Sequence, residues 1–180
     1  MALSATIYNI DIDLADHDHG VFESFSVRAA RHPSESEEYF VTRLLAYAME
    51  YADGIEFSKG GISSPEDPPI AIRDLTGGIT SWIEIGNPDA ARLHKASKAS
   101  PRVAVYTHKD PAQLVALLKG ERIHRAEHLE LRAIDRALVA GLASRLDRRM
   151  SFTLSIVDRE LTVAFDSGTL TGAVISVAIT

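Results

Sequence analysis

The sequence predicts a single mixed α/β domain, and three observations support this class. Apolar and polar residues alternate near both ends of the chain, which is the period of half-buried strands. Helical periodicity appears between these segments. An unbroken apolar run at residues 103–106, VAVY, is typical of a strand buried on both faces. With 180 residues and no visible repeat or linker, one domain over residues 1–180 is expected.

Composition and charge limit the classes of function. Hydrophobic residues make up 46% and charged residues 24% of the chain, as in ordinary globular proteins. No apolar run reaches the roughly 20 residues of a membrane span, and residues 1–8 lack a secretory signal, so a cytoplasmic protein without membrane contact is expected. The net charge of −6 argues against bulk electrostatic binding of nucleic acid, which would need a local basic patch. The absence of cysteine excludes disulfides and cysteine-ligated zinc.

The first expected element is a hairpin. Residues 8–14 alternate apolar and polar, and residues 21–27 can pair with them. The turn between them carries four side chains of metal-ligand type: Asp16, His17, Asp18 and His19. Polar residues before a glycine at a hairpin tip are more often a solvated turn, and this interpretation is preferred to a metal site.

A helix follows the hairpin. Ser34 and Glu37, three residues apart, form a capping box at its start, while Glu35 could favour the positive helix terminus. Its expected buried face comprises Phe40, Val41, Leu44, Leu45, Tyr47, Ala48 and Tyr51. Gly54 ends the helix before a short strand at residues 55–57. Residues 60–69, rich in serine and proline, are expected to be a mobile loop.

The next two strands, at residues 70–75 and 79–86, are joined by a tight Gly77-Gly78 turn. Pro88 suits the first turn of a helix that extends to about residue 99. The remaining expected elements are a strand at 102–107, a helix at 111–119, a strand at 129–133, a helix at 135–146, and antiparallel strands at 152–156, 161–165 and 173–179. The VAVY strand should lie beside the strand that carries Glu84, because a helix between two strands usually makes a parallel crossover.

Two carboxylates flank the glycine turn. Glu84 shares a strand face with Trp82, and a carboxylate buried there must be paired, hydrogen-bonded or metal-bound. Asp74 lies on the preceding strand, so a hairpin could bring the two close enough to hold Mg²⁺ or Mn²⁺. The alternative is structural: an exposed Asp74 near the turn, and Glu84 paired with Arg73 or Arg92.

Several stretches of the chain resemble a known family. ARHPSESEEYFVTRLLAYA, EFSKG, RDLTG…WIEIGNPDAARLHKA and VAVYTH are similar to the YaeQ family of bacterial proteins, and the resemblance runs from MALSATIY over essentially the whole chain. That family resembles the PD-(D/E)XK nuclease-like superfamily in fold. The resemblance implies a core of helix, three-stranded meander, helix and strand, with a central mixed sheet flanked by helices. The N-terminal hairpin and the C-terminal antiparallel strands would be additions to this core.

The resemblance also implies a metal site. Asp74 and Glu84 match the superfamily's metal-binding carboxylates, and the backbone carbonyl of Ile85 matches its main-chain ligand. Gly86 stands where the superfamily has a catalytic lysine. In some members a lysine from the following helix replaces it, and Lys95 is the candidate here.

Three further residues complete the expected site. Lys98 is the second choice for the missing lysine, and Lys98 and Arg92 share the Lys95 helix face, where they would contact a substrate phosphate. Solvated positions on an exposed helix are the alternative for these lysines. Glu38 on the first helix would be the additional acidic residue that nuclease-like relatives often have there.

These residues support two hypotheses of different classes. The first is a Mg²⁺- or Mn²⁺-dependent phosphodiesterase acting on nucleic acid, in which Asp74 and Glu84 hold the metal and Lys95 stabilises the transition state. The alternative is a non-catalytic binding or regulatory protein that keeps a degenerate nuclease fold, which Gly86 and the acidic net charge favour. A serine hydrolase is disfavoured because the sequence has no G-x-S-x-G motif.

Overall fold

The computed structural model describes residues 4–59 and 66–179 of the chain. Its strands are β1 (Thr6–Asp16), β2 (Val21–Arg31), β3 (Ile55–Phe57), β4 (Ile70–Arg73), β5 (Ile79–Ile85), β6 (Arg102–Thr107), β7 (Glu130–Ile134), β8 (Arg149–Val157), β9 (Glu160–Phe165) and β10 (Gly168–Val177). Its helices are α1 (Glu37–Met49), α2 (Ala90–Ala99), α3 (Pro111–Leu118) and α4 (Arg136–Ala143), with a 3₁₀ turn at Ala126–His128. The predicted mixed α/β class and the predicted order of elements are confirmed.

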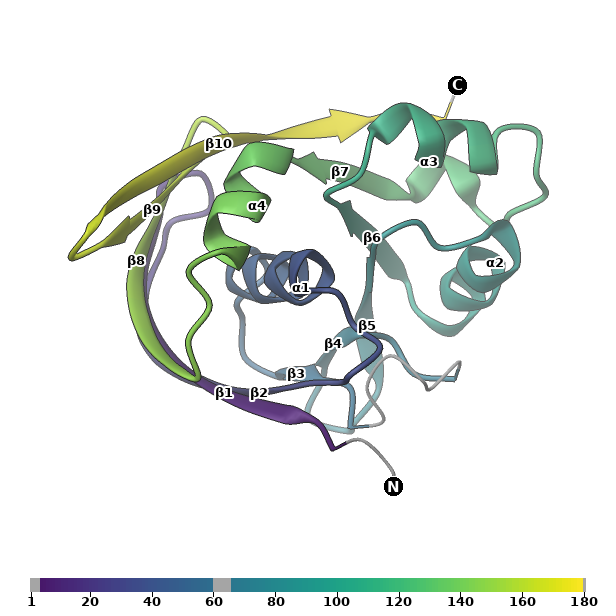
Figure 1. Ribbon diagram of the computed structural model, residues 1–180. Helices are drawn as coiled ribbons and strands as arrows, with labels where there is room; N and C mark the ends of the chain where they lie inside the picture. Colours follow the sequence, from purple (N-terminus) through teal and green to yellow (C-terminus); the bar gives the residue numbers. More distant parts are fainter. Residues whose placement is uncertain (1–3, 60–65, 180) are drawn as a thin grey trace.

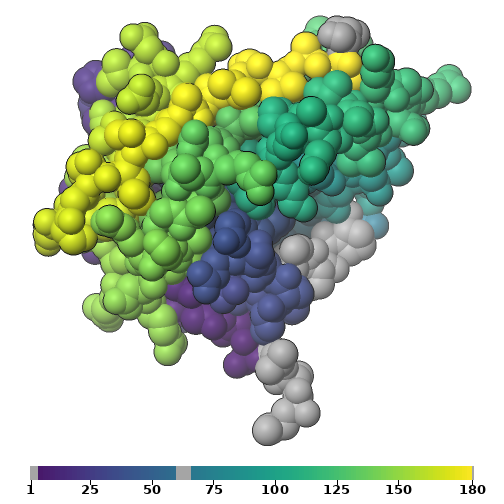
Figure 2. All heavy atoms as spheres, turned by 45° about the horizontal axis from the view of Figure 1, so that its top comes forward, coloured from purple at the N-terminus to yellow at the C-terminus, as the bar shows by residue number. Residues whose placement is uncertain are grey.

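The strands form one mixed sheet in the order β2-β1-β8-β9-β10-β7-β6-β5-β4-β3, which curves into a nearly closed barrel around α1 (Figure 1). Helices flank both faces as predicted: α1 and α4 lie on the concave side, and α2 and α3 pack on the opposite face of β5, β6 and β7. β10 connects the two parts of the sheet, because it pairs first with β9 and then with β7. In the space-filling view it is the yellow band that reaches α3 (Figure 2). The terminal strands are therefore the barrel wall and not additions to a separate central sheet.

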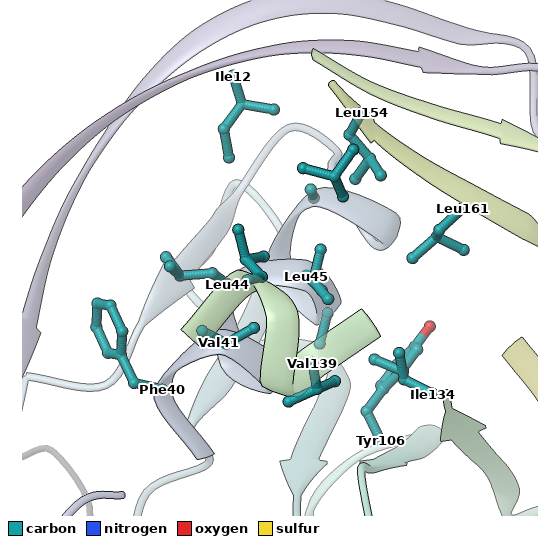
Figure 3. Close-up of a cluster of buried hydrophobic side chains, with 14 of the residues drawn as sticks. Ile12, Phe40, Val41, Leu44, Leu45, Tyr106, Ile134, Val139, Leu154 and Leu161 are labelled. Carbon is teal, nitrogen blue, oxygen red and sulfur yellow. The ribbon is translucent and has the colours of Figure 1, made fainter. Parts of the chain in front are cut away.

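α1 fills the centre of the barrel. Four of its apolar side chains are at most 1% exposed: Phe40, Val41, Leu44 and Leu45. They point toward strands of the wall and toward α4 (Figure 3). The predicted buried face is confirmed except for Tyr47 and Tyr51, which are only partly buried, and Tyr51 lies beyond the end of the helix. Burial also extends further around the helix than one face. Thr42, for example, is also buried, and its hydroxyl donates to the Glu38 carbonyl at 2.7 Å.

The start of α1 differs from the prediction. Ser36 is the N-cap, and its hydroxyl accepts a hydrogen bond from the Tyr39 N–H at 3.0 Å. The capping box predicted for Ser34 and Glu37 is therefore wrong, because the helix begins two residues later. Ser34 instead lies 2.7 Å from the Nδ1 of His32, outside the helix.

Glu35 is buried in an ion pair instead of standing at the helix terminus. Its Oε2 lies 3.1 Å from Nη2 of Arg43, and both side chains are at least 95% buried. The same Arg43 nitrogen donates to the carbonyl of Ala30 at 2.7 Å, which ties α1 to the end of β2. Removing one partner of such a buried pair typically costs about 3–5 kcal/mol.

Aromatic side chains fill the seam between the two edge strands, β2 and β3. Phe25 on β2 stacks on Tyr51 with ring centroids 3.9 Å apart, and Tyr47 stacks on Phe57 of β3 at 4.5 Å. Tyr47 and Tyr51 come from α1 and the residues just after it. The barrel is thus closed at this seam by side-chain packing rather than by hydrogen bonds between strands.

A second buried charge network lies at the end of α1. The Glu50 carboxylate accepts hydrogen bonds from Arg102, Arg132 and the Tyr106 hydroxyl, and both arginines also bind Glu130. Burial would raise the pKa of Glu50, but the hydrogen bonds from Arg102 and Tyr106, with the arginine charges, outweigh it and lower the pKa. This network fixes the end of α1 to β6 and β7.

The segment that carries Glu84 folds as predicted. β4 and β5 are antiparallel, and β6 with its VAVY run lies parallel to β5, with Glu84 opposite Val105. Gly77 adopts a φ of +88° in the turn between β4 and β5, which favours glycine. Pro88 precedes the N-cap Asp89 of α2, so its predicted place in the first helical turn is wrong.

The turn between β1 and β2 is only partly solvated. Asp16 is 1% exposed and accepts hydrogen bonds from the N–H groups of Asp18 and His19. Asp18 in turn accepts the N–H groups of Asp158 and Arg159 in the β8–β9 turn, at 2.8 Å each. The expectation of a simple solvated turn was therefore incomplete, because this turn is joined to the β8–β9 turn.

Two further expectations concern the predicted loop and the absence of a membrane span. Residues 60–65 of the loop predicted at 60–69 lie outside the described residues. Within residues 4–59 and 66–179, no helix is both long enough and apolar enough to cross a membrane.

Gly172 should be required for the packing of α4 on β10. A Cβ at this position would lie 2.7 Å from the Cβ of Asp135 and 2.8 Å from that of Leu138, so the helix would have to move. We expect Gly172→Ala to lower the free energy of unfolding by about 1–3 kcal/mol, as for other overpacked sites. Urea unfolding checks this, with Thr171→Ala on the exposed neighbouring position as the control; equal stability of the two variants would contradict it.

Candidate functional site

Glu84 lies at the end of β5, with its side chain 2% exposed. The Nε of Arg92 on α2 lies 2.6 Å from its Oε2 and 2.8 Å from its Oε1, and Trp82 Nε1 donates to Oε1 at 3.2 Å. The hydrogen bond to Glu84 raises the pKa of Arg92. Of the two arginines considered as partners, the structure selects Arg92, since Arg73 pairs with Glu56 at 2.5 Å. A buried carboxylate is thereby neutralised by a guanidinium.

Asp74 lies at the opposite end of the β4–β5 hairpin. Its Oδ1 accepts hydrogen bonds from the N–H and hydroxyl of Thr76 and from the Gly78 N–H, at 2.9, 2.6 and 2.9 Å. These hydrogen bonds, led by the one from the Thr76 hydroxyl, lower the Asp74 pKa. Glu84 lies six residues beyond Gly78, which is roughly 20 Å along a strand. The prediction that Asp74 and Glu84 approach one cation is therefore wrong.

The missing lysine at Gly86 has a conformational reason. Gly86 has a φ of +86°, a left-handed backbone that would strain a lysine at this position. The proposed replacement, Lys95, is half exposed and forms an ion pair with Glu66. Lys98 is exposed to solvent. Neither lysine lines the pocket at Glu84, so the geometry does not bring them to the carboxylate.

A pocket of about 360 Å³ opens where β5 and β6 end, beside Glu84. Its charged and aromatic lining consists of Tyr39, Asp67, Glu84, Arg92, His108 and Lys109. The N-terminal residues of α1 and the residues that lead into α2 also border it. Ligands of α/β sheets bind preferentially outside the carboxyl ends of strands, and helix N-termini favour anions. We call this cavity the Glu84 pocket.

Two titratable side chains that line the Glu84 pocket have pKa values shifted by burial and by neighbouring charges. Burial, and then the charge of Glu84, raise the pKa of Tyr39 to about 12. Burial and the neighbouring Lys109 lower the pKa of His108, so this imidazole is neutral at pH 7. His108 Nδ1 is buried and has no hydrogen-bond partner among the residues that the structure describes.

Of the two remaining predicted site residues, one lines the Glu84 pocket and the other does not. Ile85 lines the Glu84 pocket, as its expected role requires. Glu38 does not line it, although its neighbour Tyr39 on α1 does. The charge of Glu38 acts on His108, for which it opposes the lowering of the pKa.

Among the charged and aromatic residues of the pocket, sequence reasoning missed Tyr39, Asp67, His108 and Lys109. Asp67 precedes β4, and β4 runs antiparallel to β5, so the start of β4 lies beside the end of β5. His108 and Lys109 directly follow β6, which is parallel to β5. The strand directions alone could have placed Asp67, His108 and Lys109 near Glu84, whereas Tyr39 comes from α1. Within the described parts of the chain, no three His, Asp or Glu side chains are grouped as metal ligands.

Fold and site together define a mixed α/β protein whose nearly closed sheet encloses a central helix and whose charged pocket lies at the ends of two parallel strands. The chain belongs to the YaeQ protein family, whose model matches residues 1–174.

The family relatives match almost their whole length. The YaeQ protein of Escherichia coli K12 is 32% identical over 172 residues, 94% of each chain, and that of Salmonella typhi is 34% identical over 160 residues, 88% of this chain and 87% of the relative. The crystal structure of YaeQ from Pseudomonas syringae matches with a TM-score of 0.85 at 28% identity, over 97% of this chain and 96% of that one. The structure of YaeQ from Xanthomonas axonopodis pv. citri matches with a TM-score of 0.86 at 28% identity, over 97% and 99%.

The pKa of Tyr39 should report the charge of Glu84. We expect Glu84→Gln to lower this pKa from about 12, while the continued burial of the ring keeps it above its ordinary value of 10. Titration of the tyrosine Cζ carbons by NMR measures it, and Asp74→Asn is the matched control because Asp74 lies at the other end of the hairpin. An unchanged Tyr39 pKa in Glu84→Gln would show that the two groups do not interact.

Proposed function

We propose that this protein is a non-catalytic binding protein that holds a phosphate ester in the Glu84 pocket. One observation carries the proposal: Arg92 occupies the position in front of Glu84 that a metal cation would need. Three further features agree with it. Asp74 lies far from this pocket, Gly86 supplies no side chain, and Lys95 is directed to Glu66.

The lining of the pocket supports an anionic ligand. The charges of Glu84 and Arg92 offset each other, the lowered pKa leaves His108 neutral, and the remaining charges of the lining are those of Asp67 and Lys109. Lys109 is exposed at the rim, where its positive charge lies close to the starts of two helices. A phosphate group suits such a place, because helix N-termini and lysine both favour it. Nucleic acid is the phosphate ester that the nuclease-like resemblance implies.

A metal-dependent phosphodiesterase is the second candidate, and one observation favours it. Asp67 and Glu84 line the same pocket, so the carboxylate that accompanies Glu84 would be Asp67 and not Asp74. The order of helix, meander, helix and strand agrees with the PD-(D/E)XK nuclease-like superfamily. For Mg²⁺ or Mn²⁺ to bind there, the guanidinium of Arg92 would have to leave Glu84, because the metal ion and the guanidinium would compete for the same carboxylate oxygens.

Binding should depend on Lys109. We expect single- and double-stranded DNA and RNA oligonucleotides to bind in the absence of divalent cations. Lys109→Ala should weaken binding of the oligonucleotide with the highest affinity by roughly 2- to 5-fold, as for one exposed charge contact. It should also reduce the dependence of that affinity on salt concentration. Fluorescence anisotropy measures both. Lys98→Ala, an exposed lysine outside the pocket, is the control, and equal losses in the two variants would reject the Glu84 pocket as the binding site.

Metal-dependent cleavage separates the two candidates. We expect no cleavage of these oligonucleotides by the wild-type protein with Mg²⁺ or Mn²⁺. Cleavage that is lost in both Glu84→Gln and Asp67→Asn, yet retained in Asp74→Asn, would overturn the non-catalytic proposal. It would also identify Asp67 as the second metal ligand. Calorimetric titration with Mn²⁺ on the same variants measures metal binding independently of turnover.

A further inference from the structure

A larger cavity of about 600 Å³ lies at the other end of α1 from the Glu84 pocket. Tyr39, in the first turn of α1, lines the Glu84 pocket, and Met49, its last residue, lines this larger cavity. A helix of this length spans roughly 20 Å, so the two cavities are separate. Turns β1–β2 and β8–β9 form the rim of the larger one, at a mouth of the barrel. We call it the barrel-mouth cavity.

The barrel-mouth cavity has an apolar floor and a charged rim. The floor is made by Met49, Ile156, Leu161 and Val174, three of which belong to the main core. The volume lies within the range of about 300–1,000 Å³ that is usual for small-molecule sites, and such sites occur in the mouths of β-barrels. An apolar floor of this kind suits the hydrocarbon part of a ligand.

A buried carboxylate orients one side chain of the rim. Asp16, 1% exposed, lies with its Oδ2 2.8 Å from His19 Nδ1. A carboxylate only accepts hydrogen bonds, so the ring donates from Nδ1 and its Nε2 is left at the surface. The His19 side chain is 61% exposed, although its own partner is almost fully buried. This arrangement fixes an imidazole at the mouth of the cavity.

The other part of the rim is the two-residue turn between β8 and β9. Asp158 has a φ of +50° and Arg159 a φ of +64°, in a left-handed region that residues other than glycine seldom adopt. The two N–H groups of this turn are held by Asp18 at 2.8 Å each. Glycine would satisfy the same backbone without strain. The chain instead places an aspartate and an arginine there, and both line the cavity.

The charge of Arg159 helps to lower the pKa of Asp18, but its side-chain hydrogen-bond donors are not used by the described residues. Its guanidinium makes no hydrogen bond or ion pair with any residue in the described ranges, whereas Arg132, which also lines the cavity, is held by Glu50, Glu130 and Tyr106. The turn has the two positive φ angles of a type I′ hairpin, and it places these free guanidinium donors beside the cavity.

We propose that the barrel-mouth cavity binds a small amphipathic carboxylate. Its hydrocarbon part lies on the floor made by Met49, Ile156, Leu161 and Val174. Its carboxylate accepts hydrogen bonds from the Arg159 guanidinium, and the His19 imidazole lies beside it. Arginine pairs with a carboxylate through two parallel N–H donors, so the Arg159 side chain alone can bind and orient the carboxylate of the ligand. This site is independent of the phosphate ester proposed for the Glu84 pocket.

Octanoate tests the proposal by isothermal titration calorimetry on the full chain. We expect octanoate to bind, and Arg159→Gly to weaken it at least about ten-fold, as for a lost charged hydrogen bond. Glycine accepts the left-handed turn, so this variant should melt no lower than the wild type. Arg149→Gln, which changes an exposed arginine outside the cavity, should bind octanoate as the wild type does. Octanol, which has the same chain without the charge, should bind more weakly than octanoate.

Two results would overturn the proposal. One is the absence of octanoate binding at millimolar concentration in the wild type, and the other is equal affinity of the wild type and Arg159→Gly. Lys109→Ala distinguishes the two cavities, because it should leave octanoate affinity unchanged. A loss in that variant would place octanoate in the Glu84 pocket and would also reject the barrel-mouth site.

Discussion

The enclosure of α1 by the curved sheet is the constraint on which the rest of this structure depends. A helix buried on nearly all sides must satisfy each polar side chain inside the barrel, since an unpaired buried charge is costly. Glu35 with Arg43, and Glu50 with Arg102, meet this requirement near the two ends of the helix. The stacked aromatic rings between β2 and β3 complete the enclosure where no strand pairing is available.

Both cavities follow from that enclosure. A sheet wrapped around a helix covers its sides but not its ends, so the openings of the barrel lie where α1 begins and where it ends. At the start of the helix, the ends of β5 and β6 bring Glu84, His108 and Lys109 together. At its end, two hairpin turns joined by Asp18 form a rim. Charged side chains collect at these openings because water reaches them there.

Local pattern predicted most elements of the fold, but not how the sheet closes. Alternation of apolar residues identified β1, β2, β8 and β9, and the VAVY run identified β6 as a buried strand. Parallel pairing of β1 with β8 joins residues about 140 positions apart, and no short-range pattern contains it. The cap of α1 was misplaced because Ser34 and Ser36 are both acceptable caps, and tertiary contacts of Glu35 decide between them.

The sequence by itself determined the mixed α/β class, the order of elements, the opposite faces of Trp82 and Ile83 on β5, and the need of Glu84 for a partner. Only the tertiary structure decided which residue pairs with Glu84. Asp74 and Glu84 lie ten positions apart in the chain, but a hairpin places residues close only when they are equally far from its turn. Asp74 is at the turn and Glu84 at the far end, so strand register separates them. Arg92 reaches Glu84 because the crossover to β6 folds α2 back over β5, a relation that depends on packing and not on sequence spacing.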